Sequence, residues 1–229
     1  MMEIKTNKLS GTKELPSMMV IPQIAALWIA SNVGYYILFS KGYDAEPIRI
    51  ALYYIFWLAL TIFSFWNVYK GWKPVENRLS TYIIIGASIA GIVLYLTYLL
   101  PNFQPIVWAK AWQPPSELLF ATPWYFLPKS IEILLQQFLV AAMVLTFSAH
   151  EMTIKETSIW SAILFGGAHL LLVFGGSGLI HTATFTIAAV AASFVFPYLI
   201  LRVRNGFIYS NLLHWLFYAV TIVLARLVF

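Results

Sequence analysis

The sequence contains no cysteine and few charged residues among its 229 positions. Without cysteine the chain has no disulfides, no thiolate metal ligands and no cysteine nucleophile. Charged residues make up 10% of the chain, whereas about a quarter is usual in soluble domains. The hydrophobic share is 61% and the mean hydropathy is +0.79, which is more apolar side chain than one water-soluble core can bury. These shortages exclude a soluble enzyme, a disordered chain and a disulfide-stabilised secreted protein, so the solvent of this protein is the lipid bilayer.

Long uncharged runs predict transmembrane helices. A helical span needs about 20 apolar residues. The uncharged run 157–201 is about twice that length, and it contains Gly175-Gly176-Ser177-Gly178, where the chain can turn back. Alternating strands of about ten residues, as in membrane barrels, do not fit these runs. The sequence therefore predicts an all-α, polytopic membrane bundle of seven helices near 18–40, 50–69, 80–100, 130–149, 157–174, 179–200 and 207–228.

The segment 101–129 is rich in proline and tryptophan and does not fit as a span. Tryptophan favours the headgroup layer, so we expect an interfacial or re-entrant element, and a segment that enters the bundle would raise the helix count to eight. The lysine-containing N-terminus precedes an apolar run too long for a signal peptide, which favours a first transmembrane helix. We interpret residues 1–229 as a single integral membrane domain.

Basic residues predict the orientation, because cytoplasmic loops carry an excess of lysine and arginine. Nine of them fall on the side of the N-terminus and five on the other side. The N-terminus is therefore expected in the cytoplasm, in a multi-pass protein of a prokaryotic cytoplasmic membrane. No basic cluster with interleaved aromatic residues indicates a nucleic-acid partner, and the sequence does not indicate an oligomeric state.

Glu132 is the only acidic residue inside a predicted span. A carboxylate in mid-membrane costs about 3 kcal/mol on insertion scales, so such groups usually face the bundle interior and mark function. The alternative is that Glu132 lies close enough to the start of its helix to reach headgroups or water.

Three histidines share the membrane with Glu132, namely His169, His181 and His214, and two of them belong to polar helix faces. Ser161, Phe165 and His169 follow one another at four-residue steps, so they lie on one helix face. On the last helix, a polar stripe at three- and four-residue steps comprises Asn211, His214, Tyr218 and Thr221. Three polar groups on three helices indicate a shared site.

Such a set of side chains allows two chemistries. A desolvated carboxylate can act as a general base on water while an imidazole holds that water or donates to an oxyanion. Glutamate and histidine can also bind zinc, although the HExxH pattern is absent. No cofactor is required, and a divalent metal such as zinc stays an open alternative. The chain lacks the GxSxG elbow of serine hydrolases.

The segments that carry these residues resemble the CPBP family of intramembrane proteases, which includes CAAX endopeptidases and bacteriocin-processing or immunity proteins. The family pattern is EExxxR, then FxxxH, then HxxxN or HxxxD. Phe165-Gly166-Gly167-Ala168-His169 matches the second motif, and the basic stretch 201–214 resembles the turn that leads into the third-motif histidine, His214. The resemblance covers about residues 120–225, a CPBP-like catalytic core, whereas the first three helices carry no signature.

The first and third motifs depart from the family pattern. Aligning Glu132 with the first glutamate places Gln137 at the arginine, whereas the other register places Gln136 there. We favour the first register because it keeps the catalytic acid. Tyr218 stands where the family has asparagine or aspartate.

The resemblance implies a mechanism for these residues. Glu132 would be the general base on water, His169 would help to orient that water, and His214, aided by Tyr218, would stabilise the oxyanion. Gln137 would hold the structure around Glu132, with Gln136, Phe165 and Asn211 as further supporting residues. We expect a partly wet cavity lined jointly by Glu132, His169, His214 and Tyr218.

The predicted function is a glutamate-dependent intramembrane endopeptidase that cuts near the membrane surface in a membrane-anchored, lipidated or peptide substrate. One alternative is a catalytically inactive CPBP-like scaffold or immunity protein. A second is a small proton- or cation-coupled transporter that uses Glu132 as its ion site, although no internal repeat is evident.

Overall fold

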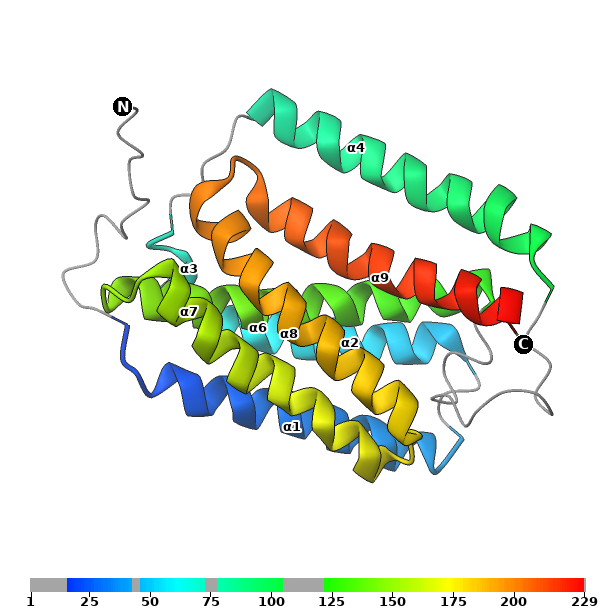
Figure 1. Ribbon diagram of the computed structural model, residues 1–229, viewed down its shortest axis with the longest axis horizontal. Helices are drawn as coiled ribbons and strands as arrows, with labels where there is room; N and C mark the ends of the chain where they lie inside the picture. Colours follow the sequence, from blue (N-terminus) through cyan, green and yellow to red (C-terminus); the bar gives the residue numbers. More distant parts are fainter. Residues whose placement is uncertain (1–15, 43–45, 73–77, 105–121, 229) are drawn as a thin grey trace.

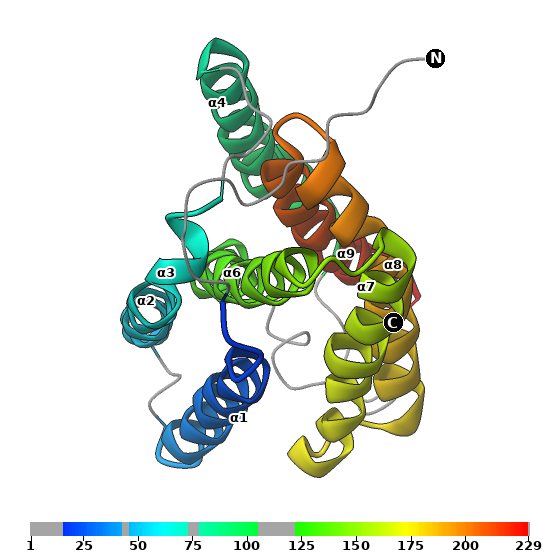
Figure 2. The ribbon, with the colours of Figure 1, turned by 90° about the vertical axis from the view of Figure 1, so that its left-hand side faces the viewer.

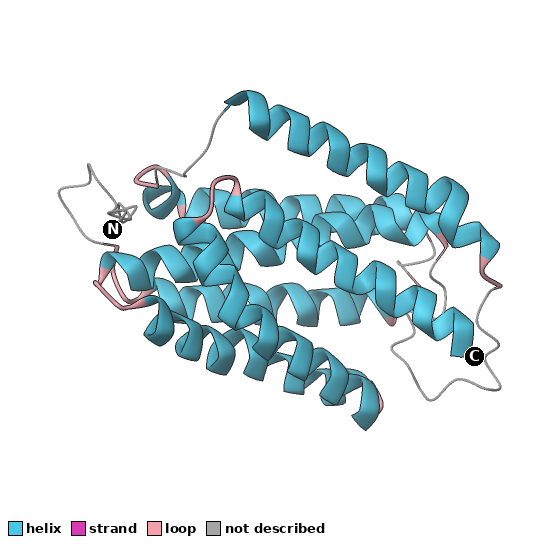
Figure 3. Cartoon of the chain, turned by 45° about the horizontal axis from the view of Figure 1, so that its top comes forward, coloured by secondary structure: helices cyan, strands magenta, loops and turns pink. Residues whose placement is uncertain are grey.

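The computed structural model describes residues 16–42, 46–72, 78–104 and 122–228. Within these ranges the chain is helical and has no strand (Figures 1 and 3). Seven helical stretches of the described chain are long and apolar enough to cross a bilayer, which confirms the predicted all-α membrane bundle. They run over Val20–Phe39, Pro47–Ser64, Arg78–Asn102, Pro123–Ala149, Ile154–Gly175, Leu179–Arg202 and Gly206–Leu227. The protein is an integral, multi-pass membrane protein.

Some of the spans are composed of more than one helical element. The single-element spans are α1 (Val20–Phe39), α2 (Pro47–Ser64), α8 (Leu179–Arg202) and α9 (Gly206–Val228), and a short α3 (Trp66–Tyr69) follows α2. The third span joins α4 (Arg78–Leu94) to a π-helical turn η2 (Tyr95–Leu99) and a 3₁₀ turn η3 (Leu100–Asn102). The fourth joins a 3₁₀ turn η5 (Pro123–Tyr125) to α6 (Phe126–Ala149). The fifth joins α7 (Ile154–Ser161) to a π-helical turn η6 (Ala162–Gly166) and a 3₁₀ stretch η7 (His169–Gly175).

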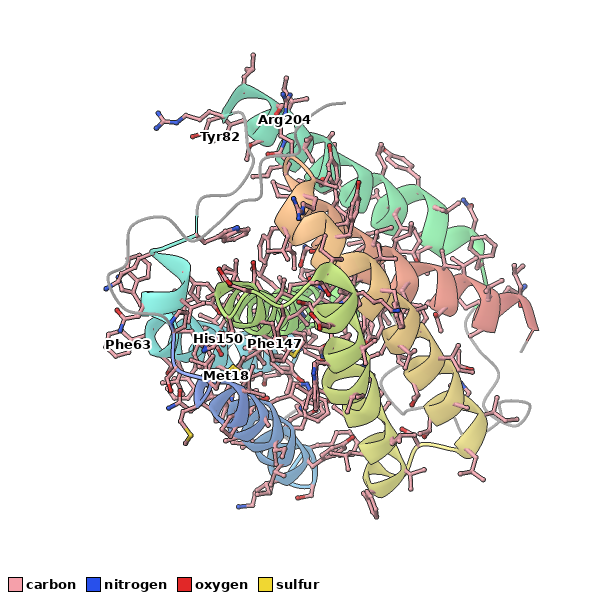
Figure 4. All side chains as sticks on the ribbon, turned by 60° about the vertical axis from the view of Figure 1, so that its left-hand side comes forward. Met18, Phe63, Tyr82, Phe147, His150 and Arg204 are labelled. Carbon is pink, nitrogen blue, oxygen red and sulfur yellow. The ribbon has the colours of Figure 1, made fainter. Side chains whose placement is uncertain are left out.

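Helix α6 forms the centre of the bundle. Most of its residues are buried, whereas only a minority are buried in each of the other spans, and α6 contacts α1, α2, α7, α8 and α9. Figure 2 shows α6 surrounded by these helices, with α4 at the edge. Large apolar side chains such as Phe63 and Tyr82 project outward (Figure 4), as expected where the solvent is lipid. Polar groups on α6 are therefore shielded from lipid by the helices around it.

Helix α6 begins earlier than the sequence indicated. The predicted helix began at residue 130 and left Lys129 in the loop 101–129, whereas Lys129 lies inside α6 and is buried. Pro128 does not prevent this, because proline is tolerated in the first turn of a helix. Residues 105–121, and with them the predicted interfacial or re-entrant element, lie outside the described residues.

The turn between α8 and α9 fixes the position of the last helix. Asn205 adopts a φ of 58°, in the left-handed region that asparagine tolerates better than most residues. Its side chain accepts a hydrogen bond from Thr81 Oγ1 at 2.7 Å and donates one to Ser80 Oγ at 2.9 Å. At Gly206 a Cβ would lie 1.7 Å from the carbonyl oxygen of Leu199. The asparagine thus ties the α8–α9 turn to α4, which contains Ser80 and Thr81, and the glycine lets α9 fold back against α8.

Candidate functional site

A buried ion pair occupies one face of α6. Lys129 Nζ lies 2.7 Å from Glu132 Oε2, and the two side chains are 4% and 13% exposed. Glu132 Oε1 accepts a hydrogen bond from Gln136 Nε2 at 3.0 Å. Residues three and four apart share a helix face, so the helix itself brings these three side chains together. Glu132 is thus held within the bundle by its own helix.

Lys129 is a residue of the site that the sequence does not indicate. Basic residues commonly flank spans, so the sequence places this lysine in the loop 101–129. The available signal was the three-residue spacing between Lys129 and Glu132, which places an ammonium next to a carboxylate on any helix that contains both.

Two tyrosine rings cover the ammonium of Lys129. Its Nζ lies 4.7 Å from the centre of the Tyr218 ring and 5.6 Å from that of Tyr125, within the range of cation–π attraction. The Tyr218 ring also stacks on His214, with the ring centres 5.7 Å apart and the planes at 29°. Tyr218 therefore links the ion pair on α6 to the histidine on α9 through its ring.

His169 lies where the fifth span changes its helical form. The α-helical turns of α7 give way to the π-helical η6, a type of distortion frequent at functional sites, and His169 begins the 3₁₀ stretch η7. A Cβ on Gly166 would lie 2.6 Å from Val190 Cγ2, so glycine there lets α8 approach closely. The span ends at the predicted turn, where Gly176 has a φ of 85°.

The hydrogen bond of His169 defines which ring nitrogen is free. Its Nδ1 lies 2.7 Å from the carbonyl oxygen of Phe165. A carbonyl only accepts, so Nδ1 carries the proton and donates. In the neutral ring this leaves Nε2 as a hydrogen-bond acceptor.

His214 has the opposite arrangement. Gln137 Nε2 lies 3.0 Å from His214 Nδ1, and Ser210 Oγ donates to Gln137 Oε1 at 3.0 Å. With the amide oriented in this way, Nδ1 accepts and the ring proton lies on Nε2, which becomes a donor. Gln137 therefore hydrogen-bonds to His214, whereas the neighbouring Gln136 hydrogen-bonds to Glu132.

Two adjoining hollows contain the predicted residues. The first, which we call the polar hollow, has a volume of about 40 Å³. Its lining comprises Trp28, Asn32, Tyr35, Tyr36, Tyr54, Tyr125, Lys129, Glu132, Gln136, His169, Leu172, Phe185 and Tyr218. A water molecule needs about 10–15 Å³, so the polar hollow has room for water next to Glu132 and His169.

The second hollow, which we call the apolar hollow, lies toward α8 and α9 and has a volume of about 310 Å³. His214 lines this hollow together with alanine and phenylalanine side chains. The two hollows share His169, Phe185 and Tyr218. The predicted single cavity with all four residues is therefore divided in two, with His169 and Tyr218 on the boundary.

Phe165 and Asn211 differ in their relation to the site. The Phe165 ring lies 4.9 Å from that of His169 and 6.1 Å from that of His214, edge-on to both. Asn211 lines neither hollow, and its Oδ1 is buried without a hydrogen-bond partner among the residues that the structure describes. Phe165 therefore supports the site by packing between the imidazoles, whereas Asn211 lies outside it.

The fold and these groups define a multi-pass helical membrane protein with an intramembrane polar site. Within the described ranges, no cluster of three or more His, Cys, Asp or Glu side chains could hold a metal ion. Comparison of the chain with protein-family models, curated proteins and solved structures finds no match. The site offers a carboxylate, an imidazole acceptor and an imidazole donor.

Proposed function

We propose that the protein is a glutamate-dependent intramembrane endopeptidase of the CPBP type. Its substrate would be a membrane-anchored, lipidated or peptide chain cut near the membrane surface, and its location the cytoplasmic membrane of a prokaryote, with the N-terminus in the cytoplasm. The observation that carries the proposal is that Glu132 and His169, on different helices, line one hollow large enough for water.

The first chemical step is activation of water. Glu132 accepts a proton from a water molecule in the polar hollow while Nε2 of His169 accepts its second hydrogen bond. The resulting hydroxide attacks the peptide carbonyl carbon, and the proton passes from Glu132 to the leaving amine. A positioned general base contributes about 10²–10⁴-fold to such a reaction. Lys129 Nζ, 2.7 Å from Oε2, compensates the charge of the carboxylate. Oε1, which accepts one hydrogen bond from Gln136, would be the oxygen that takes the proton.

Stabilisation of the oxyanion falls to His214. Its Nε2–H is the donor left by the hydrogen bond to Gln137, and a donor aimed at the developing charge stabilises the tetrahedral intermediate. The stacked ring of Tyr218 restricts the orientation of the imidazole. Since His214 lines the apolar hollow beside His169, the scissile carbonyl would lie at the boundary between the two hollows.

The test is cleavage by the purified protein in phosphatidylcholine vesicles mixed with detergent-solubilised bacterial membrane proteins. New N-termini are counted by mass spectrometry. We expect Glu132→Gln to lower their rate of formation at least about 100-fold, as for loss of a general base. Glu46→Gln is the matched control, because Glu46 also pairs with a basic residue three positions away but on the exposed surface, and it should keep the wild-type rate.

Folding of each variant is checked by its elution as a monodisperse species. If Glu132→Gln does not fold, His169→Gln provides the second test, with an expected loss of at least tenfold. Wild-type protein that produces no more new N-termini than the folded Glu132→Gln or His169→Gln variant would contradict the proposed function.

A further inference from the structure

A third hollow, which we call the lateral groove, lies between α1 and the η6–η7 region, with α6 as its floor. Figure 2 shows α1 and α7 on either side of α6 at this point. The groove has a volume of about 120 Å³. Its lining comprises Ile21, Ile24, Ala25, Trp28, Ile29, Gln136, Leu139, Val140, Met143, Leu164, Phe165, Ala168 and Leu171. Trp28 and Gln136 also line the polar hollow, so the two spaces meet at these residues.

One face of α6 runs along both spaces. Met143, Val140 and Gln136 are spaced at three and four residues and border the lateral groove, and the same face continues through Glu132 to Lys129 in the polar hollow. The stripe changes from apolar to charged along the helix. A chain that lies along this stripe would therefore extend from an apolar surface to the catalytic carboxylate.

The lateral groove opens to the membrane. Ile29 on α1 and Leu171 on η7 line it and are 48% and 46% exposed. Both residues belong to spans that cross the bilayer. An occupant of the groove therefore arrives sideways from the lipid phase.

A buried donor and a buried acceptor lie where the groove meets the polar hollow. The Nε1 atom of Trp28 and the Oε1 atom of Gln136 have no hydrogen-bond partner within the described part of the chain. Gln136 is 8% exposed. A buried polar atom without a partner is destabilising, and hydrocarbon tails offer neither a donor nor an acceptor. An N–H donor and an oxygen acceptor that border the same space are the groups with which the carbonyl and the N–H of a peptide backbone pair.

We propose that the lateral groove binds an unwound stretch of another protein's transmembrane segment. A backbone N–H of that segment donates to Gln136 Oε1, and a backbone carbonyl accepts from Trp28 Nε1. The segment must be unwound, because an intact helix already pairs its own backbone groups. The substrate class is therefore a membrane span interrupted by glycine or proline.

This inference rests on the proposed function and locates the cleaved bond. Gln136 and Glu132 are four residues apart on α6, which corresponds to about 6 Å along the helix. An extended chain advances about 3.3 Å per residue. The cleaved bond is thus about two residues from the peptide unit that Gln136 holds.

The absence of native cysteine allows a direct test by disulfide cross-linking. Ile29→Cys and Leu171→Cys place a thiol in the groove, each in the Glu132→Gln background so that bound peptide is not cut. Ile187→Cys is the control, because Ile187 is 69% exposed on α8 and lines none of the three hollows. The probe is a leucine–alanine transmembrane peptide with a central Gly-Pro break and one nearby cysteine, in phosphatidylcholine vesicles oxidised with copper phenanthroline.

We expect cross-linking at Ile29→Cys and Leu171→Cys at least fivefold faster than at Ile187→Cys. Adding Gln136→Leu or Trp28→Phe should lower the groove rates at least threefold, and an unbroken leucine–alanine peptide should cross-link more slowly than the Gly-Pro peptide. Any one of three results would overturn the proposal: cross-linking at the same rate at all three positions, cross-linking at the same rate by the two peptides, or cross-linking in the groove that Gln136→Leu and Trp28→Phe do not slow.

Lipid is the competing occupant. A photoactivatable phosphatidylcholine should label the groove less when the Gly-Pro peptide is added, and labelling unchanged by peptide would also overturn the proposal. Cross-linking requires no cleavage, so its outcome is separate from that of the Glu132→Gln assay. Peptide binding in the groove without cleavage would reject the endopeptidase alone, and cleavage without binding in the groove would reject this inference alone.

Discussion

Two ion pairs in this protein have the same three-residue spacing and similar N–O distances but different surroundings. Arg49 Nε lies 2.9 Å from Glu46 Oε2 at the start of α2, with side chains 50% and 59% exposed. Lys129 Nζ lies 2.7 Å from Glu132 Oε2 on α6, with side chains 4% and 13% exposed. Helices α2 and α6 pack against each other. The difference between the pairs is therefore burial and not distance.

Burial changes what each pair contributes. An exposed pair is worth about 0–1 kcal/mol. A buried pair loses much of its attraction to desolvation, and replacing both partners with apolar side chains is often neutral or stabilising. Stability alone thus gives no reason to retain Lys129 and Glu132 at the centre of a bundle in lipid. A chemical role for the carboxylate does give one.

The largest expected effect on stability comes from breaking the buried pair on one side. Lys129→Met leaves the Glu132 carboxylate buried without its counter-ion, and such a change costs about 3–5 kcal/mol. The free energy of unfolding in mixed detergent micelles measures this loss. A cost below about 1 kcal/mol, the value typical of an exposed pair, would show that water or lipid headgroups already solvate Glu132.

Removing both charges sharpens the comparison. The double variant Lys129→Met/Glu132→Leu leaves no buried charge, so we expect its free energy of unfolding to return to within about 1 kcal/mol of the wild-type value. The measurement is the same unfolding titration, with Lys129→Met alone as the reference. A double variant as unstable as the single one would mean that the pair itself holds α6 in the bundle.

A smaller effect is expected where Tyr218 covers the ammonium. Tyr218→Leu removes a ring 4.7 Å from Lys129 Nζ, whereas Tyr218→Phe keeps it, and a desolvated cation–π contact is worth about 2 kcal/mol. Tyr218→Leu should therefore be less stable than Tyr218→Phe by about that amount. In a Lys129→Met background, where no ammonium is present, the stability difference between Tyr218→Leu and Tyr218→Phe should be smaller. If this difference is unchanged in that background, the Tyr218 ring stabilises the protein by packing alone.

The smallest effect is expected at the exposed pair. Arg49→Met should change the free energy of unfolding by about 0–1 kcal/mol, and this change should diminish as ionic strength rises, because salt screens exposed charges. The effect of Lys129→Met should be insensitive to salt. Titrations in about 50 mM and about 500 mM sodium chloride, between which the Debye length falls about threefold, make the comparison. An equal salt response at both pairs would contradict the assigned difference in burial.

The spans could be predicted from the sequence because the bilayer imposes a simple requirement. A stretch that crosses it must be long and nearly free of charge, and the uncharged runs coincide with the observed helices. The turn at Gly175–Gly178 was found for a related reason, since a run twice the needed length must turn back. The start of α6 was misplaced because the charge of Lys129 was read as a boundary, although its ammonium is paired inside the bundle.

The sequence indicates some of the candidate site residues. Glu132 stands out as the acidic residue inside a predicted span, and Phe165 and His169 stand out by their four-residue spacing; the structure brings all three to adjoining hollows. Residues of α1 and α2, such as Trp28 and Tyr54, also line the polar hollow. They belong to no sequence motif, and they reach the hollow because helices distant in the sequence pack together. Gln136 and Gln137 could not be distinguished in the sequence, because consecutive residues point about 100° apart on a helix and the choice of partner depends on where α9 lies.

The central claim is that the buried carboxylate is retained for peptide hydrolysis and not for stability. The most direct measurement is the cleavage of bacterial membrane proteins by the Lys129→Met/Glu132→Leu variant, once its free energy of unfolding has been shown to match that of the wild type. We predict a folded protein that forms new N-termini no faster than vesicles without protein. A double variant that cleaves at the wild-type rate would contradict the claim.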